Sequence, residues 1–147
     1  MSVVSNFKKE LINKISALSS VQQVYGWENN NPQGFPSVMV TNASVDGEFF
    51  SNAENRRVYA FRVMVLFDIG SNLQGAANDR VQEAERIVAE VVEEILNAVD
   101  TDYTFSGAPD VLWVDAVDSD YGYVEYDGGW AKSAEMTIRI NTDKVVA

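Results

Sequence analysis

The sequence contains no histidine and no cysteine. Without histidine there is no imidazole base that titrates near neutral pH, and a Ser-His-Asp catalytic triad is excluded. Without cysteine there is no thiol nucleophile, no disulfide, and no thiolate site for zinc or an iron–sulfur cluster. These two absences remove many of the usual catalytic groups and fit a protein that is not an enzyme and uses no cofactor.

Positive charge is also scarce. The chain has 11 Lys and Arg residues against 22 Asp and Glu residues, which gives a formal net charge of -11. Binding to duplex DNA or to an anionic membrane requires basic residues, so the composition disfavours both as partners. No apolar run approaches the roughly 20 residues that span a bilayer, and residues 1–9 lack the apolar core of a signal peptide. We therefore expect synthesis in the cytoplasm and no membrane partner.

The 147 residues suit a single domain over residues 1–147 with one hydrophobic core. Hydrophobic residues make up 46% of the chain, an ordinary value for a globular protein. No repeat, linker or low-complexity block divides the sequence. The domain should bury enough surface to fold without a metal or a disulfide.

Two segments carry apolar residues at helical spacing. Residues 7–18 have one apolar stripe, and Ser5 or Asn6 could cap such a helix. Residues 74–99 have a second stripe, with glutamates along the polar side. Because each helix has a single apolar stripe, we expect both helices to pack on the same face of a sheet.

Five segments have strand character: residues 21–27, 38–40, 57–68, 111–117 and 130–142. Residues 44–55 are polar and predict a loop or a hairpin tip. In the strongest strand a uniformly apolar face alternates with a mixed face, which predicts one core side. The predicted core positions on the two longest strands are Tyr59, Phe61, Val63, Val65, Phe67, Ala134, Met136, Ile138 and Ile140.

The element order is α-β-β-β-α-β-β, with short turns between several strands. Short turns favour antiparallel pairing. The sequence therefore predicts an α+β fold, with a mostly antiparallel sheet and both helices packed on one face.

An acidic run is the clearest candidate for a metal site. It comprises Asp115, Asp118, Asp120, Glu125 and Asp127. Carboxylates at alternate positions can collect calcium or magnesium, but the twelve-residue calcium loop and its terminal bidentate glutamate are missing. Residues 118–129 therefore predict a solvent-exposed acidic hairpin, and a calcium- or magnesium-binding domain stays an alternative.

Three arginines gather at one predicted strand: Arg56, Arg57 and Arg62. They could form salt bridges to another subunit, or they could protect a strand edge from unwanted pairing. The pair Phe49 and Phe50 lies at a polar tip, where exposed aromatic side chains can anchor an interface.

Five segments in this order resemble the tail-terminator (tail-completion) proteins of long-tailed bacteriophages. They are the helix over residues 7–18 and the segments GFPSVMVTN, RRVYAFRVMVLFDI, DRVQEAERIVAEVVEEIL and AKSAEMTIRIN. The resemblance covers nearly the whole chain and is one of pattern. Other small proteins of the phage neck share parts of this plan, so a head-completion or connector adaptor is an alternative. A monomeric ligand-binding domain is another.

The resemblance implies a structural virion protein that forms a hexameric ring at the head-proximal end of the tail tube. Such a ring stops tube polymerisation and docks to the head connector. The implied partners are further copies of the chain, the tail tube protein and the connector proteins. DNA would pass through the lumen without specific binding, and an acidic lumen would repel its phosphates.

Closing a ring requires two different patches on each subunit. We expect one patch around Arg56, Arg57 and Arg62. The other patch would be acidic, and its candidate residues are Glu83, Glu90 and Glu94 on the second helix, or Asp118 and Asp120 on the acidic hairpin. Phe49 and Phe50 are candidates for contact with the tube or the connector.

Overall fold

The computed structural model describes residues 2–51, 54–70, 78–105, 108, 110–127 and 129–145. The predicted order of two helices and five strands is confirmed. The elements are α1 (Val3–Ser16), β1 (Gln23–Tyr25), β2 (Ser37–Ser51), β3 (Glu54–Gly70), α2 (Asn78–Thr101), β4 (Val111–Tyr126) and β5 (Gly129–Val145).

The five strands form one sheet in the order β1-β2-β3-β5-β4. β1 pairs in parallel with the start of β2, and every other pairing is antiparallel. β5 therefore lies between β3 and β4, although α2 and β4 separate it from β3 in sequence. The fold class is α+β, as the sequence predicts.

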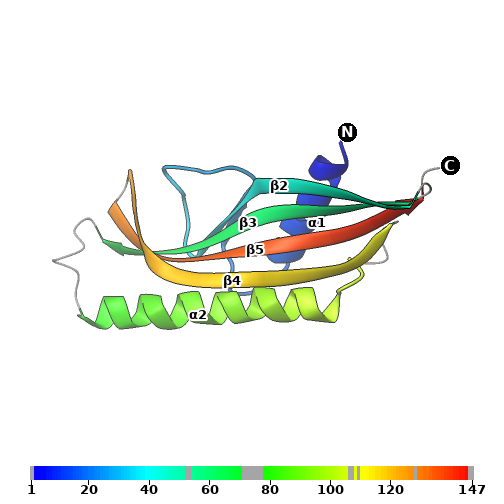
Figure 1. Cartoon of the computed structure of the whole chain (residues 1–147). Helices are drawn as coiled ribbons and strands as arrows, with labels where there is room; N and C mark the ends of the chain where they lie inside the picture. Colours follow the sequence, from blue (N-terminus) through cyan, green and yellow to red (C-terminus); the bar gives the residue numbers. More distant parts are fainter. Residues whose placement is uncertain are drawn as a thin grey trace.

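Both helices pack on the same face of the sheet. The buried face of α1, which includes Leu11 and Ile15, and the buried face of α2, which includes Val88 and Ile95, belong to one apolar cluster. The strand positions predicted to face the core join this cluster, and Ile138 is fully buried. Figure 1 shows α2 running along the length of the sheet next to β4, whose two ends curve away from the helix.

The first helix begins earlier than predicted. Its N-cap is Ser2, whose hydroxyl accepts a hydrogen bond of 3.0 Å from the backbone N–H of Ser5. The predicted caps Ser5 and Asn6 are therefore wrong, and both residues lie inside the helix. The apolar spacing defines the buried stripe but not the first turn, because Val3 and its neighbours there are largely exposed. α1 ends at Ser16, and Ala17 is its C-cap.

Four of the strands are longer than predicted, whereas β1 is shorter than the predicted residues 21–27. Residues 44–51 belong to β2 and residues 54–55 to β3, so of the two predictions for residues 44–55 the hairpin holds and the loop is wrong. The predicted acidic hairpin over residues 118–129 is present as the antiparallel pair of β4 and β5, but residues up to Tyr126 are strand and not turn. The side chains of these stretches are largely polar, and each stretch pairs with a neighbouring strand on one side, β3 for β2 and β5 for β4.

Part of the second predicted helix lies outside the described residues. α2 is described from Asn78 to Thr101, which places residues 78–99 of the prediction in the helix; residues 74–77 are not described. Within the part of the chain that the structure describes, no helix is long and apolar enough to cross a membrane.

Candidate interaction site on the open sheet face

The sheet face that points away from α1 and α2 is called the open face here. Along β3, core residues such as Phe61 alternate with residues of the open face such as Ala60 and Arg62. At one end a small apolar cluster of Met39, Leu66 and Ala131 covers this face, with Phe35 packed against it. Over the rest of the open face, no described helix packs on the strands, so their side chains meet solvent or a partner.

Charged side chains form cross-strand pairs on the open face. Asp115 on β4 lies directly opposite Arg139 on β5. The guanidinium donates two hydrogen bonds to the carboxylate, from Nε to Oδ1 at 3.1 Å and from Nη2 to Oδ2 at 2.9 Å. On β3, Arg62 Nη1 lies 3.6 Å from Glu135 Oε1 on β5. All four side chains are partly exposed, so the pairs sit at the surface.

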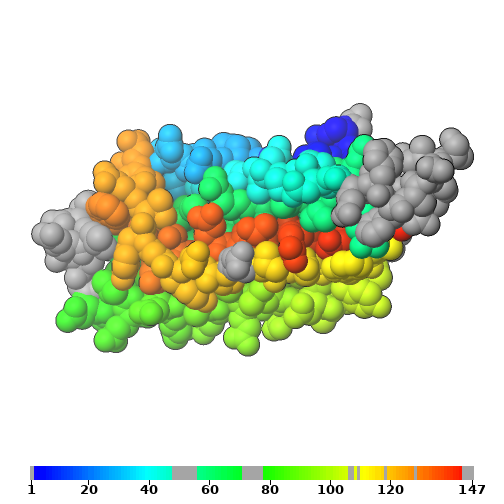
Figure 2. Space-filling model, in the orientation of Figure 1, coloured from blue at the N-terminus to red at the C-terminus, as the bar shows by residue number. Residues whose placement is uncertain are grey.

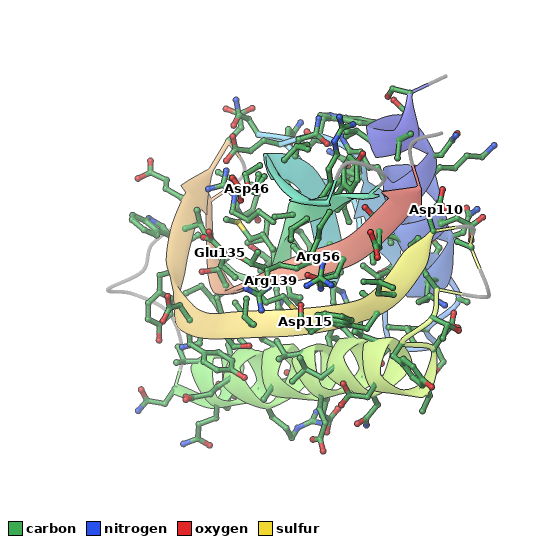
Figure 3. All side chains as sticks on the ribbon, turned by 45° about the vertical axis from the view of Figure 1, so that its right-hand side comes forward. Asp46, Arg56, Asp110, Asp115, Glu135 and Arg139 are labelled. Atoms are coloured by element: carbon green, nitrogen blue, oxygen red, sulfur yellow. The ribbon has the colours of Figure 1, made fainter. Side chains whose placement is uncertain are left out.

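An aromatic side chain lies beside this charged row. The guanidinium of Arg56 lies 5.9 Å from the ring centroid of Trp113, which is 40% exposed. Figure 3 shows Arg56 near the Arg139 and Asp115 pair. Aromatic residues and arginine are enriched in protein contact surfaces, so the exposed Trp113 beside Arg56 suits such a surface. The described side chains of the open face contain no nucleophile activated by a neighbouring base.

The three predicted arginines do not form one patch. Arg56 and Arg62 lie on the open face, and Arg57 lies on the helix-bearing face because side chains alternate along β3. Arg57 is exposed and stands opposite Gly47 of β2. A Cβ atom added at Gly47 would lie 3.8 Å from Arg57 Cγ, so the arginine stem passes beside β2.

The predicted acidic patch on α2 lies in the helix layer, away from the open face. Glu83 and Glu90 are exposed, and Glu94 is partly buried. Glu90 accepts a hydrogen bond of 3.0 Å from Arg86 Nη1 one turn earlier. This intrahelical pair supplies some local charge compensation for an otherwise acidic helix.

The acidic run does not assemble a described metal site. Because β4 is a strand, Asp120 lies on the open face while Glu125 lies on the other face. Asp115 is engaged by Arg139. The side chain of Asp118 lies outside the described residues. Among the residues whose side chains are described, no group of three carboxylates could hold a metal ion.

The structure describes the backbone of the predicted aromatic pair but not its side chains. Phe49 and Phe50 lie near the end of β2, and their side chains are outside the described residues. The pairs formed by Arg139 and by Glu135 were not predicted from the sequence. The only sequence signal for these pairs was the presence of opposite charges on different predicted strands. Predicting which charges meet also requires the register between the strands.

Lys132 is a second missed feature. Its side chain is buried, and its ammonium lies 4.7 Å from the ring centroid of Tyr123 and 5.8 Å from that of Tyr121. The two tyrosines are two residues apart on β4, so both rings fall on one face and stand over the lysine. Cation–π attraction stabilises a charge in such a position.

Tyr126 joins three elements at one end of the sheet. Its hydroxyl donates a hydrogen bond to Asp68 at the end of β3. The other oxygen of Asp68 lies 3.5 Å from Arg80 Nη2 at the start of α2, and the Arg80 guanidinium lies 5.0 Å from the Phe67 ring centroid. Burial, followed by the hydrogen bond to Asp68, raises the pKa of Tyr126 well above its usual value.

No protein-family model matches this chain, and no curated protein matches it significantly.

Proposed function

We propose that this protein is a ring-forming structural component of a bacteriophage tail. In this proposal it sits at the head-proximal end of the tail tube, ends tube polymerisation and provides the surface that joins the head. The sequence resemblance supports the assignment, since its segments correspond to α1, to part of β2 and β3, to α2 and to β5.

The open face is the observation that carries the proposal. β2, β3, β4 and β5 are 15 to 17 residues long. This is more sheet than is needed to pack two helices on one face. The uncovered side bears paired charges and an exposed tryptophan, which suits a contact with protein. The opposite surface, on α2, is acidic. A ring requires two unlike surfaces on each subunit, and the β2 side and the β4 side of the sheet supply two different edges.

The charge supports a passage for DNA without binding. A net charge of -11 and the acidic exposed side of α2 repel phosphates. No chemistry is required of the protein in this role, and we propose no enzymatic activity. Its partners would be further copies of itself, in a hexamer, together with the tail tube protein and the head connector in the virion.

The first test is the solution mass by light scattering across a concentration series, followed by electron microscopy of the heaviest species. We expect a ring with a central hole. The second test adds the protein to polymerising tail tube protein of the same phage, and we expect tubes that stop growing and carry a ring at one end. Tubes that elongate unchanged, together with binding to the isolated head connector, would replace the proposal with a head-completion adaptor.

A further inference from the structure

The outer edge of β2 is free along most of its length. β1 pairs only with Ser37, Val38 and Met39, whereas β2 continues to Ser51. No other described strand lies on that side of β2. The described hydrogen bonds of turns, loops and caps do not involve the backbone of residues 40–51 either. The edge therefore offers backbone N–H and C=O groups to an added strand.

The sequence does little to protect this edge. Residues 40–51 contain no lysine, arginine or proline, the residues that usually prevent pairing at an edge. The protection that it has consists of register shifts between Asn42 and Ser44 and between Phe49 and Ser51, and of the charged residues Asp46 and Glu48. The side chains of residues 42–47 are exposed, and Val45 is 50% exposed. A stable strand edge of this kind is expected to have a partner.

A pocket of about 200 Å³ opens at the same edge. Its lining is mostly apolar and comes from α1, the bulge of β2 and the facing part of β3: Val4, Asn42, Ala43, Ser44, Val45, Tyr59, Ala60 and Phe61. Addition of a strand to a sheet edge combines backbone hydrogen bonds with a pocket that accepts a side chain of the added strand. In this protein the free edge of β2 and the pocket lie side by side.

The chain itself carries a suitable strand at the opposite edge of the sheet. β2, β3, β5 and β4 are antiparallel in turn, so β2 and β4 run in opposite directions. Two copies placed side by side in the same orientation would bring β4 of one against β2 of the next in an antiparallel pair. Figure 2 shows β4 at the surface beside α2 and β2 toward the opposite edge of the visible face, with β5 between them.

Side chains at the two edges complement each other. Tyr121 and Tyr123 on β4 are 50% and 43% exposed and lie on the helix-bearing face. Val45 in the pocket wall lies on that same face, because it pairs with the core residue Tyr59.

We propose that β4 of one copy adds to the free edge of β2 in the next copy, with a β4 tyrosine in the pocket. This contact is heterologous, so repeating it generates a ring in which the long free edges of β2 and β4 are paired. The inference rests on the proposed function in that it names the contact between ring subunits.

The absence of cysteine makes cross-linking a direct test. Ala43→Cys on β2 is mixed with single-cysteine variants along β4, at Val117, Ser119 and Tyr121, and the mixture is oxidised. Within one copy β2 and β4 are separated by three strand spacings, roughly 14 Å, and each variant has one thiol, so every disulfide joins two molecules. We expect mixed disulfides between the β2 and β4 variants. Disulfides only between identical variants would overturn the proposal.

A charge at the edge should block the contact. Ala43→Lys places a protective lysine on β2, and Ala89→Lys on the exposed side of α2 is the matched control. We expect Ala43→Lys to weaken self-association at least about tenfold, with the control within about twofold of wild type. Circular dichroism and the melting temperature check that both variants fold.

The outcomes separate this contact from the proposed function. Rings that form equally well in Ala43→Lys, without β2–β4 disulfides, overturn the edge contact and leave the tail role standing. Association through β2 and β4 in a protein that does not cap tail tubes supports the contact and overturns the tail role. A wild-type protein that stays monomeric up to millimolar concentration and gives no mixed disulfides overturns the contact.

Discussion

The hydroxyl of Tyr126 donates a hydrogen bond to the carboxylate of Asp68, which is 58 residues earlier in the sequence. The bond joins the end of β4 to the end of β3, two strands that are not neighbours in the sheet. Arg80 approaches the same carboxylate from the start of α2. The three residues therefore hold the helix and two strand ends together.

Replacing Tyr126 with phenylalanine should destabilise the fold. The ring contacts would remain, but Asp68 would lose a donor in a partly buried position, so we expect the free energy of unfolding to fall by about 1 kcal/mol. Tyr103→Phe is the matched control, because that side chain is 57% exposed, and it should change little. Urea denaturation of the three proteins measures the difference. Equal losses in both variants would show that the bond to Asp68 contributes nothing specific.

The same bond should make stability fall at high pH. Burial and Asp68 raise the pKa of Tyr126 in the folded protein above the value of about 10 in the unfolded chain. Below pH 10 both states keep the proton, and the stabilisation is fully present. Above it the unfolded chain releases the proton first, so stability is lost as pH rises. The difference between wild type and Tyr126→Phe should therefore begin to shrink near pH 10 and continue to shrink as the pH rises further, in urea titrations.

Exchanging Asp115 and Arg139 for each other should be tolerated, whereas reversing the charge of only one of them should destabilise the fold. Asp115→Arg would place two guanidinium groups opposite each other, and we expect a loss of about 1 kcal/mol in unfolding free energy. The double variant Asp115→Arg with Arg139→Asp should recover most of it. Added salt should reduce the cost of the single reversal, since both side chains are partly exposed. A double variant as unstable as the single one would contradict a direct pair.

Arg57→Glu should weaken assembly and leave the fold intact. Arg57 is exposed and lies next to Gly47 of β2, so a glutamate at this position would repel an acidic neighbouring subunit. Arg86→Glu on α2 is the matched control and should lose only the few tenths of a kcal/mol of its pair with Glu90. Light scattering measures assembly and thermal unfolding measures stability. Unchanged assembly in Arg57→Glu would remove this residue from the interface.

The sequence predicts the layers well because burial leaves a periodic pattern. Alternation along β3 assigns Phe61 to the core, and helical spacing assigns Leu11 and Ile15, all of which are buried. Element ends are predicted less well. Ser2 caps α1 through a local hydrogen bond that apolar spacing does not reveal, and the polar half of β4 is a strand only because β5 lies beside it.

The open face is predicted in part. The mixed side of β3 indicates a face that is partly wet or covered by a subunit, and Arg62 lies there. The partners of the charged residues could not be predicted, because Arg139 and Asp115 meet through a register between strands that short-range patterns do not determine. Because side chains alternate along a strand, Arg57 must lie on the opposite face of β3 from Arg56. The prediction that these two arginines share one patch was therefore wrong.

The position of β5 has a consequence for how the chain reaches this structure. β5 forms two of the three long antiparallel pairings, yet it follows β3 and β4 in the sequence. During synthesis, β3 and β4 therefore emerge before β5, and the strand edges that pair with β5 stay unpaired until it is made. Folding of the whole sheet must close long loops before its central contacts form, which slows the process and exposes apolar strands to other chains. A nascent protein of this topology would gain most from a chaperone in the interval before β5 leaves the ribosome.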